Sequence, residues 1–84
     1  MTTTILGYMS AAMRRAQYER LQDGSGGWYA HIPGFEGLWA SGPTIEEARA
    51  ELYDALDGWL TVNYVISKLD LPDVGVQLGA EEKV

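Results

Sequence analysis

Residues 44–60 constrain the fold of this chain most strongly, because they predict one long amphipathic helix. The segment opens with a capping box, in which the Thr44 side chain accepts a hydrogen bond from the Glu47 amide and Glu47 reaches back. An apolar stripe of this length needs a surface to cover, so we expect a sheet beneath it. The stripe consists of Ile45, Ala48, Leu52, Leu56 and Trp59.

Upstream of that helix, turn residues divide the chain into short segments that read as strands. The cluster Asp23-Gly24-Ser25-Gly26-Gly27 is a strong turn signal. Pro33-Gly34 ends the next segment, because proline has no amide hydrogen to donate to a ladder and glycine accepts positive φ. The pattern predicts a hairpin and a third antiparallel strand, over residues 16–21, 28–32 and 38–41.

Helical spacing of apolar residues near the start predicts a helix over about residues 4–14, capped by Thr3 or Thr4. In so small a domain this helix either docks on its own domain or contacts a neighbouring copy. We favour the second alternative and expect a homo-oligomer. The candidate oligomer contacts are Ile5, Leu6, Met9 and Met13.

The end of the chain predicts one more strand. The long helix continues weakly through residue 66 and must end before Leu71-Pro72, because the residue before a proline resists the helical region. Apolar and other residues then alternate over 74–78, as in a strand. We therefore expect a single α+β domain over residues 1–84, with its core at about 16–78.

Composition limits the classes of partner. The chain has 84 residues, 12 of them acidic and 6 basic, with a formal net charge of -6 and no cysteine. This balance disfavours nucleic-acid phosphates and favours a basic partner, unless the acids serve solubility alone. No segment approaches the ~18 apolar residues of a membrane span, and no basic stretch of a signal peptide opens the chain. We expect a cytoplasmic location and no membrane contact.

No catalytic or metal site is expected. A nuclease of the ribonuclease-H type needs several carboxylates converging on Mg²⁺, yet Glu36 is the only acid between Gly27 and Pro43. His31 is the only histidine, and the sequence shows neither a nucleophile nor a metal-ligand set around it. The chain is therefore interpreted as a protein without enzymatic activity and without a cofactor.

Aromatic side chains are the candidate partner-binding residues. Successive side chains of a strand point to opposite faces, so Trp28 and Tyr29 are expected on opposite sides of the sheet. One of them should pack under the long helix, while the other either forms an interface or simply lies on the sheet surface. The candidates are Trp28, Tyr29, His31, Phe35 and Trp39.

The chain resembles the HicB-like antitoxin family in two stretches. One is an aromatic strand and turn, Tyr29-Ala30-x-Ile32-Pro33-Gly34-Phe35-x-Gly37, and the other is a helix opening, Gly42-x-Thr44-x-Glu46-Glu47-Ala48. The likeness covers about residues 16–72 and implies a partial ribonuclease-H-like β-β-β-α-β domain, here with an extra N-terminal helix. Glu36 stands where the family usually has proline, but Gly37 is kept, so the turn is expected to survive.

The resemblance implies a function by binding. Members of this family neutralise HicA-like toxins, which are small basic proteins that cleave mRNA, and many form dimers or tetramers. The expected partner is such a toxin, with its surface occluded by the acidic, aromatic-rich face. The alternative is an orphan oligomeric module of the same fold that binds a small molecule or another protein. Many members also carry a DNA-binding tail, for which the residues after the last strand leave no room, so no direct nucleic-acid contact is expected.

Overall fold

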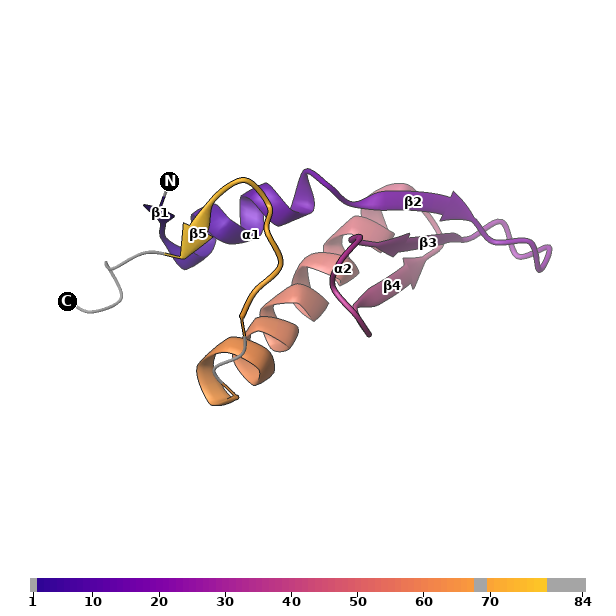
Figure 1. Ribbon diagram of the computed structural model, residues 1–84. Coiled ribbons are helices and arrows are strands. Elements are labelled where there is room, and N and C mark those ends of the chain that lie inside the picture. The colour runs from indigo at the N-terminus through magenta and orange to yellow at the C-terminus, as the bar shows by residue number, and fades with distance from the viewer. Residues whose placement is uncertain (1, 68–69, 79–84) are drawn as a thin grey trace.

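The computed structural model describes residues 2–67 and 70–78 and has the predicted α+β class (Figure 1). An N-terminal helix, three antiparallel strands and a long helix follow one another along the chain. The elements are β1 (Thr2–Thr3), α1 (Ile5–Met13), β2 (Gln17–Arg20), β3 (Trp28–His31), β4 (Trp39–Gly42), α2 (Ile45–Leu60), the π-helical η1 (Thr61–Ile66) and β5 (Gln77–Leu78).

Strands β2, β3 and β4 form an antiparallel sheet in that order, as the turn signals predict. Ala30 in the central strand pairs with Tyr18 on one side and with Ala40 on the other. The connection between β2 and β3 places Gly24 and Gly26 at φ values of 83° and 77°, a region that glycine enters without steric cost. No boundary of these three strands differs from the predicted one by more than one residue.

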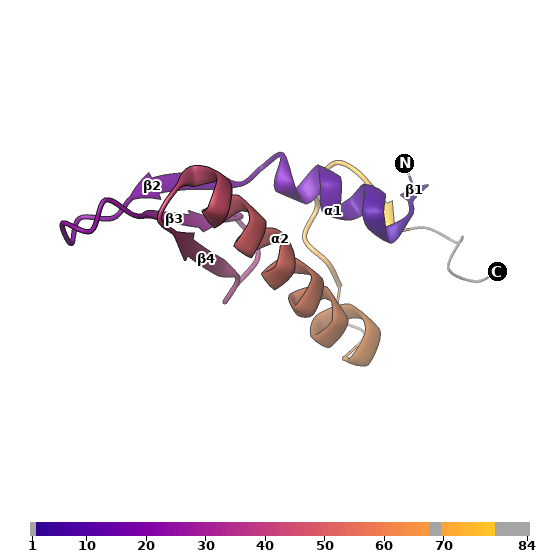
Figure 2. The same cartoon turned by 180° about the vertical axis from the view of Figure 1, so that it is seen from behind.

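Helix α2 covers one face of this sheet, and the predicted capping box starts it (Figures 1 and 2). The Glu47 amide donates to Thr44 Oγ1 at 3.0 Å, and the Thr44 hydroxyl donates to Glu47 Oε1 at 3.3 Å. The start of the helix lies very close to β4, because a Cβ built on Gly42 would be 2.7 Å from the Ala48 nitrogen. The start of α2 therefore lies directly on β4, where Gly42 has no side chain to hold the helix away.

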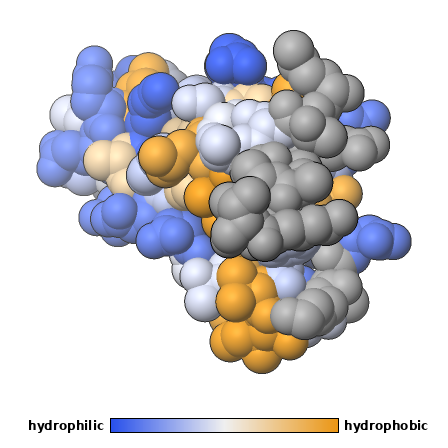
Figure 3. All heavy atoms as spheres, turned by 90° about the vertical axis from the view of Figure 1, so that its left-hand side faces the viewer, coloured by the Kyte–Doolittle hydropathy of each residue, from blue (hydrophilic) through white to orange (hydrophobic). Residues whose placement is uncertain are grey.

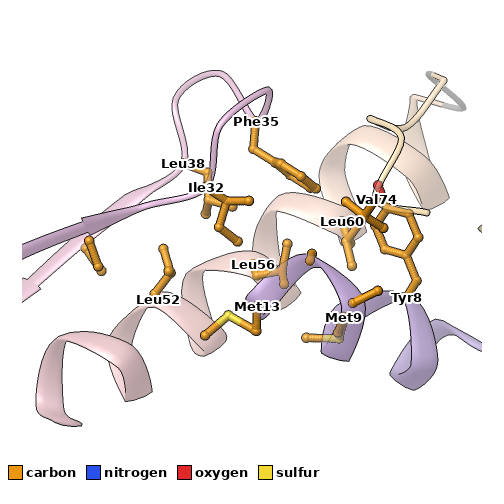
Figure 4. Packing of buried hydrophobic residues seen from close by; sticks show 14 of the residues in the cluster. Tyr8, Met9, Met13, Ile32, Phe35, Leu38, Leu52, Leu56, Leu60 and Val74 are labelled. Carbon is orange, nitrogen blue, oxygen red and sulfur yellow. The ribbon is translucent and has the colours of Figure 1, made fainter. Parts of the chain in front are cut away.

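Helix α1 docks on its own domain and completes the core (Figure 4). Its Tyr8, Met9 and Met13 are buried in one cluster with Leu56 and Leu60 of α2. Two of the predicted oligomer contacts, Met9 and Met13, are thus only 3% and 5% exposed and offer almost no surface to another copy. The physical reason is that a sheet of three short strands leaves part of α2 uncovered, and α1 covers it.

The two ends of the described chain meet in a second, two-stranded sheet. Strand β5 pairs in parallel with β1, with Thr2 opposite Gln77 and Thr3 opposite Leu78. The last strand is therefore shorter than the predicted 74–78 and pairs with an N-terminal strand that the sequence did not indicate. The Tyr8 hydroxyl also donates to the Pro72 carbonyl at 2.6 Å, which ties α1 to the segment before β5.

We expect the stability of the fold to fall between about pH 10 and pH 12 because of Tyr8. Burial, together with the nearby Asp73 carboxylate, raises the pKa of Tyr8 to about 12. Between these values the unfolded chain releases the phenol proton and the folded chain keeps it, so the free energy of unfolding falls as the pH rises. Urea unfolding at several alkaline pH values measures this loss. Tyr8→Phe should remove it and Tyr53→Phe should not; an identical pH dependence in Tyr8→Phe would contradict this assignment.

No helix among residues 2–67 and 70–78 combines the length and apolar character needed to cross a membrane.

Candidate functional site

The sheet face opposite α2 carries three stacked aromatic rings. The Tyr29 and His31 ring centres are 5.5 Å apart with planes at 29°, and those of Tyr29 and Trp39 are 6.0 Å apart at 28°. The Trp39 side chain is 56% exposed, while Tyr29 and His31 are partly buried. We call Tyr29, His31 and Trp39 the aromatic platform.

Strand alternation and register together create the platform. In β3, Ala30 is fully buried toward α2, so Tyr29 and His31 on either side of it point away from the helix. In the β3–β4 ladder His31 lies opposite Trp39, and directly paired residues project from the same face. The predicted separation of Trp28 from Tyr29 across the sheet is thereby reproduced.

The neighbouring strand β2 adds a carboxylate to this face. Glu19 pairs with Tyr29 and Gln17 pairs with His31, and both β2 side chains are exposed. Paired residues of antiparallel strands have Cβ atoms about 4.5–5.5 Å apart, so Glu19 is the neighbour of Tyr29 on this face. Sequence reasoning missed Glu19, because its pairing depends on how many residues the glycine-rich turn contains. Counting outward from that turn would have found it.

Two of the five predicted partner-binding residues lie elsewhere. Trp28 projects from the α2 side of the sheet, is packed against the core, and has the Arg20 guanidinium carbon 5.5 Å from its ring centre. Phe35 is only 4% exposed, and its ring contacts Trp59 with centres 4.9 Å apart. The structure thus gathers three of the five candidates on one surface and leaves Phe35 with almost no area for a partner.

The turn at residues 33–37 explains why Phe35 is buried. Trp59 Nε1 donates to the Glu36 carbonyl at 2.9 Å, which holds the turn against α2. Gly34 and Gly37 have φ values of 91° and 79°, so glycine is what this backbone requires at both positions. The chain forms this turn with Glu36 at the position where the resembled family usually has proline. Its chain reversal directs Phe35 inward.

A second exposed apolar surface lies at the far end of α2, where the helix continues into η1 (Figure 3). Val62, Val65 and Ile66 are 54%, 52% and 68% exposed. Figures 1 and 2 place this end of the helix away from the three-stranded sheet. Ile5 and Leu6 of α1 are also exposed, at 40% and 65%, so an oligomer contact at these two residues stays a prediction.

Within residues 2–67 and 70–78, no three His, Cys, Asp or Glu side chains gather in a way that would hold a metal ion. A shallow groove runs beside the first half of α2, with Met13 and Tyr53 among its lining residues. It also contains Glu46, Arg49 and Asp54, so charges of both signs line it. We choose the aromatic platform over this groove as the candidate binding site, because its rings lie on paired strands of the sheet.

These features define a small α+β protein with one sheet face under a helix and the other presenting aromatic side chains. The chain belongs to the UPF0150-like family, whose model matches residues 7–72 and whose members are small toxin–antitoxin-associated proteins. The resemblance is thereby confirmed at the level of this family, while the antitoxin role of the chain and its assignment to the HicB branch remain hypotheses.

A solved structure shares the fold. The crystal structure of TTHA0281 from Thermus thermophilus is similar with a TM-score of 0.77 and 33% sequence identity, over 89% of this chain and 90% of that chain. No curated protein gives a significant match. A second chain of nearly the same length therefore adopts the fold that carries the aromatic platform in this protein.

Proposed function

We propose that this chain is a HicB-like antitoxin that binds a small basic, mRNA-cleaving toxin of the HicA type and neutralises it by covering its surface. The proposal is supported by membership of a toxin–antitoxin-associated family and by the resemblance of the turn and helix opening to HicB-like antitoxins. The observation that carries it is the exposed aromatic platform on the open face of the sheet.

Exposure of Trp39 beside the partly buried rings of Tyr29 and His31 favours a binding role. Tyr and Trp are enriched among the residues that dominate binding energies at protein interfaces. A Trp39 side chain that is 56% exposed still has most of its apolar area to bury against a partner. Because the platform rests on paired strands, its rings are held in place before the partner arrives, and binding loses little side-chain entropy.

The charge of the chain suits a basic partner. The net charge of -6 is accompanied by exposed acids along α2, and the first two of them stand in its first turn, where the helix dipole favours them. Such a field accelerates encounter with a cationic protein and repels nucleic acid. The exposed acids of α2 are Glu46, Glu47, Glu51, Asp54 and Asp57.

Binding alone is sufficient for this function. A protein that covers the RNA-binding surface of a nuclease inhibits it without a nucleophile, a metal or a cofactor, provided that the complex outlives an encounter with RNA. We therefore propose a non-enzymatic role, without a cofactor. Self-association of the chain belongs to the same hypothesis. The exposed apolar surface at the end of α2 lies away from the sheet face that would meet the toxin, so one chain could use both surfaces.

The test is purification of the tagged protein from its native cells, followed by reconstitution. We expect a small basic protein to co-purify in near-equal amount, to cleave RNA by itself and to lose that activity when one equivalent of this chain is added. A co-purified basic protein that cleaves no RNA, or whose cleavage continues in the complex, would contradict the antitoxin function. Recovery of the chain alone would favour the orphan oligomeric module.

A further inference from the structure

We propose that the aromatic platform and Glu19 together bind an arginine side chain of the partner protein. This inference rests on the proposed function, because it names the chemistry by which a basic partner is recognised. The platform supplies flat aromatic surface and Glu19, paired with Tyr29, supplies the carboxylate. A guanidinium group is the side chain that uses both at once, by stacking on a ring and by donating to a carboxylate.

The ring geometry leaves surface for a planar cation. Rings with planes at 28–29° and centres 5.5–6.0 Å apart are offset rather than fully overlapped, so part of each ring face remains open. Trp39 and His31 are the two end rings of the row, with Tyr29 between them, and Trp39 is the most exposed of the three. Tryptophan is also the aromatic side chain that attracts cations most strongly. An arginine side chain is therefore expected to lie over Trp39 and reach toward Glu19 across Tyr29.

The charges on this face favour a cation over a nucleobase. The face positions of the three strands, read from their pairing, contain one carboxylate and no lysine or arginine. They are Gln17, Glu19, Tyr29, His31, Trp39 and Ser41. Single-stranded nucleic acids also stack on aromatic rings, but their binding sites combine those rings with basic side chains for the phosphates. A phosphate here would meet Glu19 and a chain of net charge -6.

The other face of the same sheet already contains the proposed contact. There the Arg20 guanidinium carbon lies 5.5 Å from the centre of the Trp28 ring. The pair joins neighbouring strands, since Arg20 is opposite Trp28 in the β2–β3 ladder. On the open face, Trp39 is paired with His31 and not with an arginine. An arginine of the partner protein would lie over Trp39 on the open face, as Arg20 lies over Trp28 on the covered face.

The experiment uses two defined peptides and needs no identified partner. Acetyl-Gly-Arg-Gly-Arg-Gly-amide and its lysine counterpart are titrated into the full-length protein, and chemical shifts of the backbone and of the Trp indole amides are followed by NMR. We expect the arginine peptide to bind about fivefold more tightly than the lysine peptide, because lysine stacks poorly and is strongly hydrated. The shifts should centre on Trp39, Tyr29 and Glu19. Equal binding of the two peptides, or shifts centred on the acids of α2, would overturn the proposal.

Matched variants separate this site from general acidity. Trp39→Ala and Glu19→Gln should each weaken binding of the arginine peptide about threefold or more. Their controls, Tyr53→Ala and Glu46→Gln, remove an exposed aromatic ring and an exposed carboxylate from α2 and should leave the affinity unchanged. Glu19→Gln keeps the size of the side chain, so it remains informative should Trp39→Ala fold poorly. Equal losses in variants and controls would contradict the site.

The outcomes also distinguish this inference from the proposed function. If the Trp39→Ala and Glu19→Gln variants neutralise the toxin as fully as the unmodified chain does, the antitoxin function holds and the arginine site is ruled out. If the arginine peptide binds at the platform but the chain neutralises no nuclease, the arginine site holds and the antitoxin function is ruled out. Binding of a single-stranded RNA oligonucleotide at the platform, abolished by Trp39→Ala, would replace the arginine ligand by a nucleobase.

Discussion

Replacing Gly42 by alanine is expected to lower the free energy of unfolding by about 3 kcal/mol, a large effect for one methyl group. The added Cβ would lie 2.7 Å from the Ala48 nitrogen and 3.0 Å from the Glu47 carbonyl carbon. Both atoms belong to the backbone of α2, so no side-chain rotation relieves the contact. The helix must move away from β4, and the burial of its apolar stripe suffers. Urea unfolding monitored by circular dichroism measures the change.

Gly58→Ala is the matched control for this prediction. Gly58 lies within α2, and a Cβ built there meets no heavy atom within 4 Å. Alanine forms helices better than glycine by about 1 kcal/mol, so this variant should be more stable than the unmodified chain by up to that amount. The same chemical change thus has opposite signs at two positions. Wild-type stability in Gly42→Ala would show that the helix does not approach β4 so closely.

Leu56→Ala is expected to destabilise the chain by about 3–5 kcal/mol, the range for a leucine removed from a tightly packed core. Leu56 has no exposed surface, and Figure 4 shows it in the middle of the cluster formed by the sheet, α2 and α1. A domain of this size has a total stability on the order of 4–13 kcal/mol, so this loss removes a large share of it. Thermal and urea unfolding should both record it.

Leu6→Ala is the control for the core prediction. Leu6 lies in α1 and is 65% exposed, so its truncation should change the stability by no more than about 0.5 kcal/mol. A loss below about 1 kcal/mol in Leu56→Ala would contradict the packing of α1 against α2. If Leu6→Ala cost as much as Leu56→Ala, this face of α1 would be buried, as the predicted oligomer contact requires.

The sequence alone was enough to predict the two α-helices, the three strands of the central sheet and the two faces of its central strand. These features depend on residues close together in the chain. The Thr44–Glu47 capping box spans a single helical turn, and the glycines of the turns act through their own φ angles. The alternation that places Ala30 and Tyr29 on opposite faces needs only the period of a strand. The α+β class follows from these local features.

Only the tertiary structure decided which aromatic residues form the candidate site. Phe35 and Trp39 stand in the same stretch and look alike as partner contacts, yet the turn at 33–37 buries one and β4 exposes the other. Glu19 joins the platform solely through its pairing with Tyr29. The pairing of β1 with β5 and the docking of α1 likewise depend on surfaces far apart in the sequence. Burial and register are properties of the assembled fold, because each is set by the partner that a residue meets rather than by the residue itself.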